Sequence, residues 1–139
     1  AAAVADAELA SIKEIEALRD EMERGLLSVA PEVTFFGAEA ERLPNTSYLA
    51  MPGVKAETQL MALDLDGIYV SAGSACSSGK VSASHVLQAM GVPETDAQTA
   101  IRVSLGWASD RSDIERFIQA WTAIYQRLGA DNQKNVPAA

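Results

Sequence analysis

The sequence predicts an α+β fold in which a small antiparallel or mixed sheet is covered by helices. Three observations lead to this prediction. Short segments rich in aromatic and β-branched residues have the composition of strands, and segments with apolar residues three and four positions apart have the pattern of helices. The two kinds of segment intermingle along 139 residues, a length that suits one domain with a modest core.

A long amphipathic helix is expected over residues 1–30. Its apolar residues recur at spacings of three, four and seven with charged residues between them, namely Ile12, Ile15, Met22, Leu26 and Val29. Pro31 ends the helix, because proline has no N–H to continue the helical hydrogen bonding. The apolar stripe needs a packing partner. Either it covers the sheet of this domain, or the helix connects to a preceding domain.

The middle of the chain predicts strands and one helix. The segments VTFFG (33–37) and NTSYLAM (45–51) read as short strands. The segment KAETQLMALDLDG (55–67) reads as a helix with Gly67 just beyond its C-terminus. The segment IYVS (68–71) reads as a further strand.

The last third of the chain predicts two helices around a strand. A short helix capped by Ser82 or Ser84 should end at Gly91, and IRVSLG (101–106) alternates like a strand, with Arg102 on the face opposite its apolar neighbours. The final helix should begin near a Ser109 cap and end at Gly129. Its apolar stripe comprises Ile114, Phe117, Ile118, Trp121, Ile124, Tyr125 and Leu128.

Composition excludes some classes of partner. The formal net charge is −8, which argues against a nucleic-acid partner, because binding to phosphates depends on clustered Lys and Arg. No apolar run approaches the roughly 18 to 20 residues of a membrane span, and the N-terminus lacks the basic region of a secretory signal. Because a single cysteine cannot form an internal disulfide, a reducing compartment is expected, with the cytoplasm as the default location.

The only cysteine, Cys76, lies in a loop of small residues between the expected strand 68–71 and the following helix. The spacing is close to that of a phosphate-binding P-loop, but five residues separate Gly73 from Gly79 where the motif has four. In addition, Val81 follows Lys80 where the motif needs Ser or Thr. The P-loop interpretation is therefore disfavoured.

Two interpretations of the loop remain open from composition alone. Gly/Ser/Ala segments are often flexible connectors, and a lone cysteine is often a small buried hydrophobe. However, the polar neighbours Ser74, Ser77 and Ser78 indicate a thiol near solvent. An accessible thiolate is a strong nucleophile, and Lys80 adds local positive charge.

The segment SAGSACSSGKVSASHVLQAMGV (71–92) resembles the active-site loop of cysteine desulfurases, the NifS/IscS-like branch of the class V aminotransferases. The flanking segments LPNTSYLAMPGVKAETQLMALDLDGIYVSAGSACSSG (43–79) and AIRVSLGWASDRSDIERFIQAW (100–121) resemble other parts of the same domain, in the same order. The resemblance covers about residues 33–128.

The resemblance implies the C-terminal small domain of a fold-type I enzyme that depends on pyridoxal phosphate (PLP). Residues 1–30 would then be a connector from a PLP-binding large domain, residues 31–130 the small domain with its cysteine loop at 72–80, and residues 131–139 a flexible tail. Family members remove sulfur from L-cysteine, release L-alanine and hold the sulfur as a persulfide. The family's PLP-binding lysine, histidine and aspartate motifs are not found here. This chain alone is therefore expected to be inactive.

The resemblance also implies roles for individual residues. Cys76 would be the nucleophile that accepts sulfur, and Arg102 would hold the carboxylate of the substrate. His85, the only histidine, is interpreted as structural, and Trp107 as a packing residue. No metal site is expected.

The implied partners are L-cysteine, an iron–sulfur scaffold or other sulfur-acceptor protein, and a second copy in a homodimer, with no nucleic acid and no membrane. A stand-alone persulfide carrier that receives sulfur from another protein remains the alternative. Arg102 favours the enzyme, since a pure carrier does not need to grip an amino-acid carboxylate.

Overall fold

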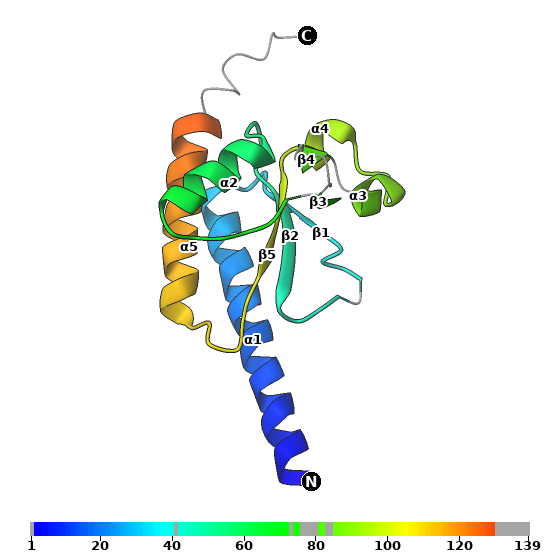
Figure 1. Ribbon diagram of the computed structural model, residues 1–139, viewed down its shortest axis with the longest axis vertical. Coiled ribbons are helices and arrows are strands. Elements are labelled where there is room, and N and C mark those ends of the chain that lie inside the picture. Colours follow the sequence, from blue (N-terminus) through cyan, green and yellow to red (C-terminus); the bar gives the residue numbers. More distant parts are fainter. Residues whose placement is uncertain (1, 41, 73, 76–80, 83–84, 130–139) are drawn as a thin grey trace.

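The computed structural model describes residues 2–40, 42–72, 74–75, 81–82 and 85–129. Its sheet separates two groups of helices: α1 and α5 lie on one side of the strands, and α3 and α4 on the other (Figure 1). The predicted α+β class is confirmed. The elements are α1 (Ala2–Val29), β1 (Thr34–Phe36), β2 (Thr46–Ala50), α2 (Ala56–Leu65), β3 (Ser74–Ala75), β4 (Val81–Ser82), α3 (His85–Ala89), α4 (Glu94–Ala97), β5 (Ala100–Ser104), α5 (Arg111–Ile124) and a π-helical turn (Tyr125–Gly129).

The main sheet has the order β1-β2-β5, and both pairs are antiparallel. Its strands lie where the sequence predicts them, but the strand predicted at 68–71 is wrong. Only Ser71 forms a bridge, to Arg102, while Ile68 and Val70 pack against the core and Tyr69 is 82% exposed. The composition of this segment suits a strand, yet Ile68 and Val70 are only partly buried and residues 68–70 pair with no strand.

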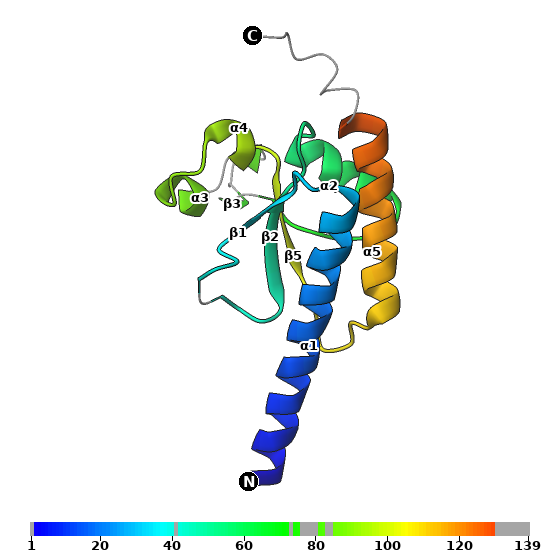
Figure 2. The same ribbon diagram turned by 180° about the vertical axis from the view of Figure 1, so that it is seen from behind.

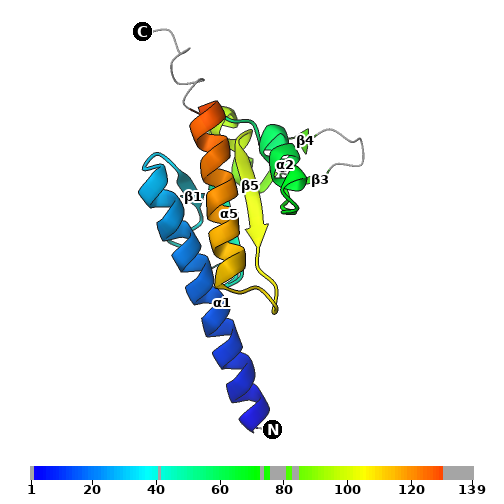
Figure 3. The ribbon, with the colours of Figure 1, turned by 90° about the vertical axis from the view of Figure 1, so that its left-hand side faces the viewer.

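Helix α1 covers the sheet with its C-terminal half, where Ile15, Met22 and Leu26 are buried in the main core. Seen from behind, α1 and α5 run side by side (Figure 2). The N-terminal end of α1 projects past the sheet (Figure 3), and the side chains of residues 5–10 are exposed. Of the two alternatives for this helix, packing on the sheet of this domain therefore holds for its C-terminal half.

Helix α5 closes the core with the predicted stripe, in which Ile114, Phe117, Trp121 and Ile124 are all buried. Its N-cap is Asp110, which corrects the prediction of Ser109. The Asp110 carboxylate accepts a hydrogen bond from the Asp113 backbone N–H at 3.1 Å and completes a capping box. The carboxylate pairs with a backbone N–H that has no partner within the helix, and its negative charge is stabilised by the positive end of the helix dipole. Hydrogen bonds from the Ser112 hydroxyl and the Asp113 N–H lower the pKa of Asp110.

A smaller cluster lies on the opposite face of the sheet. Leu87 of α3 packs there with Ala97 of α4 and Ala100 of β5. Helix α3 is followed by Gly91 in the left-handed conformation, as predicted, and Gly67 plays the same role after α2. Helix α4 was not predicted. Its four residues are too few to display a helical period.

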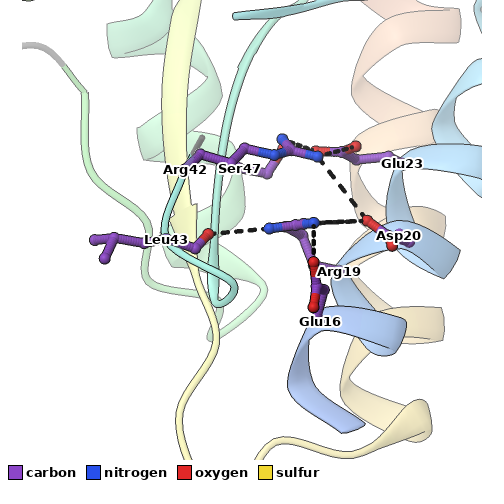
Figure 4. A network of polar contacts seen from close by, with 7 residues as sticks. All are labelled: Glu16, Arg19, Asp20, Glu23, Arg42, Leu43 and Ser47. Atoms are coloured by element: carbon purple, nitrogen blue, oxygen red, sulfur yellow. Dashed lines mark hydrogen bonds and ion pairs between the residues drawn. The ribbon is translucent and has the colours of Figure 1, made fainter. Parts of the chain in front are cut away.

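A buried polar network fastens α1 to the segment before β2 (Figure 4). Glu23 accepts two hydrogen bonds from Arg42, at 2.7 and 2.9 Å, and one from the Ser47 hydroxyl at 2.6 Å. The hydrogen bond to Glu23 raises the pKa of Arg42 above its usual range. One turn away, Arg19 donates to the Leu43 carbonyl at 3.0 Å. The hydrogen bonds of Glu23 and of Arg19 both hold the start of β2 against α1.

Candidate functional site

The site is built around Arg102, which lies in the middle of β5. Ile101 and Val103 on either side of it are buried in the main core, whereas Arg102 is exposed on the other face of the sheet. This confirms the placement predicted from the alternation of IRVSLG. Within the described part of the chain, the Arg102 guanidinium makes no hydrogen bond and no ion pair. Its donors are therefore available to a ligand.

Strand register places three further side chains beside Arg102. Arg102 pairs with Tyr48 of β2, and Tyr48 pairs with Phe36 of β1; on the other edge, Arg102 is bridged to Ser71. Residues that face each other in antiparallel pairs share one face of the sheet. We call this set, Phe36, Tyr48, Arg102 and Ser71, the Arg102 row.

One end of this face is closed and the other is open. Phe36 and Tyr48 are partly buried against the cluster formed by α3 and α4, and their rings meet edge to face with centroids 6.2 Å apart. Arg102 and Ser71 are exposed. The row therefore presents a cation beside an apolar wall, an arrangement suited to a small anionic ligand.

The loop that contains Cys76 starts from the same row. Ser71 and Arg102 exchange two backbone hydrogen bonds, Ser71 N–H to Arg102 O at 3.1 Å and Arg102 N–H to Ser71 O at 2.6 Å. Beyond them, β3 and β4 pair, with Ala75 opposite Val81. Cys76, the predicted nucleophile, and its neighbour Lys80 lie outside the described residues.

The other candidate residues are not members of the Arg102 row. His85 is the first residue of α3 and is exposed. Trp107 is 73% exposed, in the connection between β5 and α5, which corrects its interpretation as a packing residue. Burial ends at Leu105, and residues 106–108 are all exposed. Trp121 is fully buried, as the stripe predicts.

Tyr48 and Ser71 are candidate site residues that the sequence analysis missed. The signal for Tyr48 was present in NTSYLAM, where Ser47 and Leu49 are buried on the α1 side and Tyr48 alternates away from them. What the sequence lacked was the register that puts Tyr48 opposite Arg102. Ser71 could not be assigned because a single bridge leaves no periodic pattern.

The described residues do not form a site for PLP. Of the lysines, Lys13 is exposed on helix α1 and Lys55 is exposed just before α2, and Lys80 and Lys134 lie outside the described part. Lys55 lines a surface hollow of about 310 Å³, and a second hollow of about 290 Å³ lies beside α2, but neither includes Arg102. Among the described residues, no group of His, Cys, Asp and Glu is arranged to hold a metal ion. In that same part of the chain, no helix is long and apolar enough to cross a membrane.

Comparisons with known proteins agree on one family. Residues 1–117 match the family model described as aminotransferase class-V. The chain is 39% identical over 130 residues to "Cysteine desulfurase 2" of Trichormus variabilis, covering 94% of this chain and 33% of the relative. It is 39% identical over 115 residues to "Cysteine desulfurase NifS" of Azotobacter vinelandii, covering 83% of this chain and 29% of the relative.

Solved structures give the same result. A NifS-like protein from Rickettsia africae superposes with a TM-score of 0.71 at 36% identity, over 83% of this chain and 29% of that protein. A second NifS-like protein superposes with a TM-score of 0.74 at 30% identity, over 90% of this chain and 31% of the other. The chain thus spans about a third of the length of the relatives it matches.

Proposed function

Because the chain belongs to the aminotransferase class-V family and is similar to cysteine desulfurases over most of its length, we propose that it is the C-terminal part of a cysteine desulfurase. The full-length protein removes sulfur from L-cysteine and releases L-alanine. The observation that supports this most directly is the Arg102 row. There, Arg102 has no side-chain partner among the described residues and is bridged to Ser71, where the segment leading to Cys76 starts. Residues 1–30 connect to the large domain, residues 31–130 form the small domain, and residues 131–139 form a tail.

Arg102 binds the carboxylate of the substrate. A guanidinium presents its donors in a planar fork that matches the two oxygens of a carboxylate. The described chain offers Arg102 no internal carboxylate, so no ion pair has to be broken before the substrate binds. Once the carboxylate is held, the rest of the substrate can be oriented toward the thiol.

Cys76 accepts the sulfur as a thiolate. It attacks the sulfur of L-cysteine, an S–S bond forms, and the bond between that sulfur and the substrate Cβ breaks. The electron pair left on Cβ takes up a proton and gives the methyl group of L-alanine. Sulfur is oxidised and Cβ is reduced in the same step, so the reaction needs no external oxidant. Cys76 is left as a persulfide, from which sulfur can be handed on.

The number of residues between Ser71 and Cys76 is compatible with this role. Cys76 follows Ser71 by five residues, which span at most about 18 Å when fully extended. Because Ser71 is hydrogen-bonded to the Arg102 backbone, the Cα atom of Cys76 is tethered within that distance of the residue bridged to Arg102. The nucleophile therefore remains within reach of any substrate that Arg102 holds.

PLP is assigned to the part of the full-length protein that lies outside this chain, since the described residues do not form its site. When bound, PLP supplies the electron-withdrawing group that stabilises negative charge on the substrate carbon atoms. The remaining assignments are a homodimer, a cytoplasmic location, and an acceptor that is an iron–sulfur scaffold or another sulfur-transfer protein.

The test uses the full-length protein with L-cysteine and a thiol reductant, and it measures sulfide and L-alanine together with the mass of the Cys76 peptide. The wild type should release both products, and without reductant it should carry one added sulfur atom on Cys76. Cys76→Ser should release no sulfide, whereas the control His85→Gln should keep a near wild-type rate.

Arg102→Ala should raise KM at least about tenfold, the effect of losing one charge-assisted contact. Sulfide release by Cys76→Ser would exclude Cys76 as the acceptor, and an unchanged KM in Arg102→Ala would place the carboxylate elsewhere.

A further inference from the structure

Tyr48 is the side chain that the sheet places directly opposite Arg102. Opposed residues of antiparallel strands have Cβ atoms only about 5 Å apart and project from the same face. Both side chains are long and end in hydrogen-bond donors. The register therefore places the Tyr48 and Arg102 side chains next to each other on one face of the sheet.

The Tyr48 ring is held in position, whereas its hydroxyl is not engaged. The ring packs on the α3–α4 cluster and meets Phe36 edge to face at an interplanar angle of 72°. In the part of the chain that the structure describes, the hydroxyl makes no hydrogen bond, and its oxygen is not fully buried. The hydroxyl is therefore reachable by a ligand that binds on this face of the sheet.

We propose that Tyr48 is a second carboxylate-binding residue, which donates a hydrogen bond from its hydroxyl to the substrate carboxylate that Arg102 holds. This inference rests on the proposed function and adds a substrate contact to it. A carboxylate offers about four acceptor positions, of which a bidentate guanidinium uses two. The phenol hydroxyl can donate to one of those that remain.

The packing of the Tyr48 ring gives this donor an energetic advantage. A side chain that is already fixed loses little conformational entropy when it binds a ligand. Phe36 and the α3–α4 cluster provide this restraint from the closed end of the row. Arg102, at the open end, has no such support among the described residues. Tyr48 thus supplies orientation, while Arg102 supplies charge.

The test is Tyr48→Phe in the full-length protein. This substitution keeps the ring, its contact with Phe36 and the fold, and removes only the hydroxyl. We expect KM for L-cysteine to rise about tenfold, which corresponds to about 1.4 kcal/mol, while kcat changes less than about twofold, because the lost contact exists in both ground and transition states. The Kd for L-alanine, measured by titration calorimetry, should rise by a similar factor, since this product retains the carboxylate.

The matched control is Tyr69→Phe, which removes the hydroxyl of an exposed tyrosine outside the Arg102 row and should leave KM and Kd unchanged. If Tyr48→Phe keeps the wild-type KM and Kd in an active enzyme, the inference is wrong and the proposed function still stands. The inference is equally wrong if kcat falls while both binding constants stay the same. A wild-type protein that releases no sulfide would overturn the proposed function first, and the inference with it.

Discussion

Glu23 is a charged residue on the buried side of α1. It is 9% exposed, and its carboxylate holds Arg42 through two hydrogen bonds and Ser47 through a third. Such a pair is costly to break, because removing one partner leaves the other charge buried without compensation. The pair also joins α1 to β2, the strand that contains Tyr48.

We predict that Glu23→Gln lowers the free energy of unfolding by about 3 kcal/mol, measured by urea denaturation. The amide cannot accept both Arg42 hydrogen bonds without presenting its own donors to the guanidinium. Glu21→Gln is the control, because Glu21 pairs with an Arg111 that is 71% exposed, and it should cost less than about 1 kcal/mol. Equal effects in the two variants would mean that the Glu23 pair is no stronger than a surface pair.

At single positions, the sequence allowed some features to be predicted and not others. The alternation of IRVSLG placed Arg102 on the open face, since a strand has a period of two. The spacing of apolar residues in α1 identified Met22 and Leu26 as buried. It did not identify Arg19, which lies in the same stripe and is 5% exposed. Charge is expected outside, and only tertiary partners reveal the exception.

Among the elements, the contact between α1 and α5 depends on Gly25. A Cβ added at this position would lie 2.6 Å from Cδ1 of Ile118 on α5. Glycine in a helix interior costs about 1 kcal/mol relative to alanine. At this position the cost is offset by the close approach of Ile118.

We predict that the effect of Gly25→Ala depends on the residue at position 118. In the wild type, the gain in helix propensity is opposed by displacement of the Ile118 side chain. In an Ile118→Val background the crowding Cδ1 is absent, and Gly25→Ala should stabilise the domain by about 1 kcal/mol more than in the wild type. A double-mutant cycle from urea denaturation measures this difference, and purely additive effects would show that the two side chains do not compete for space.

Whole elements were predictable where their pattern is long. Helices α1 and α5 extend over many turns, and their apolar stripes leave little ambiguity. The error at 68–71 and the missed α4 both concern about four residues, too few for a period to be distinguished. The cap of α5 was misplaced by one residue because Ser109 and Asp110 are both good N-caps, and only backbone geometry chooses between them.

At the scale of the whole molecule, the isolated chain and the full-length protein should differ in activity but not in the fold of this domain. The described residues form a continuous core without a site for PLP. We predict that the purified chain shows the circular dichroism of a folded α+β protein and releases no sulfide from L-cysteine when PLP is added. Treated with a persulfide donor, it should still gain sulfur on Cys76.

The full-length protein, assayed in the same way, is the positive control for sulfide release. Sulfide production by the isolated chain would mean that it binds PLP through residues outside the described part. Failure to take up sulfur from the donor, under conditions that modify free cysteine, would mean that the thiol of this loop is not reactive.

The two backbone hydrogen bonds between Ser71 and Arg102 also have a consequence for local opening of the protein. Each residue protects the amide of the other, so neither N–H can exchange with deuterium in the solvent unless the same bridge opens. Ser71 leads to the cysteine loop and Arg102 lies in the sheet, and the two amides should therefore exchange at the same opening frequency. In the proposed enzyme, fluctuations that displace the substrate-binding Arg102 are then the same ones that free the base of the loop containing Cys76.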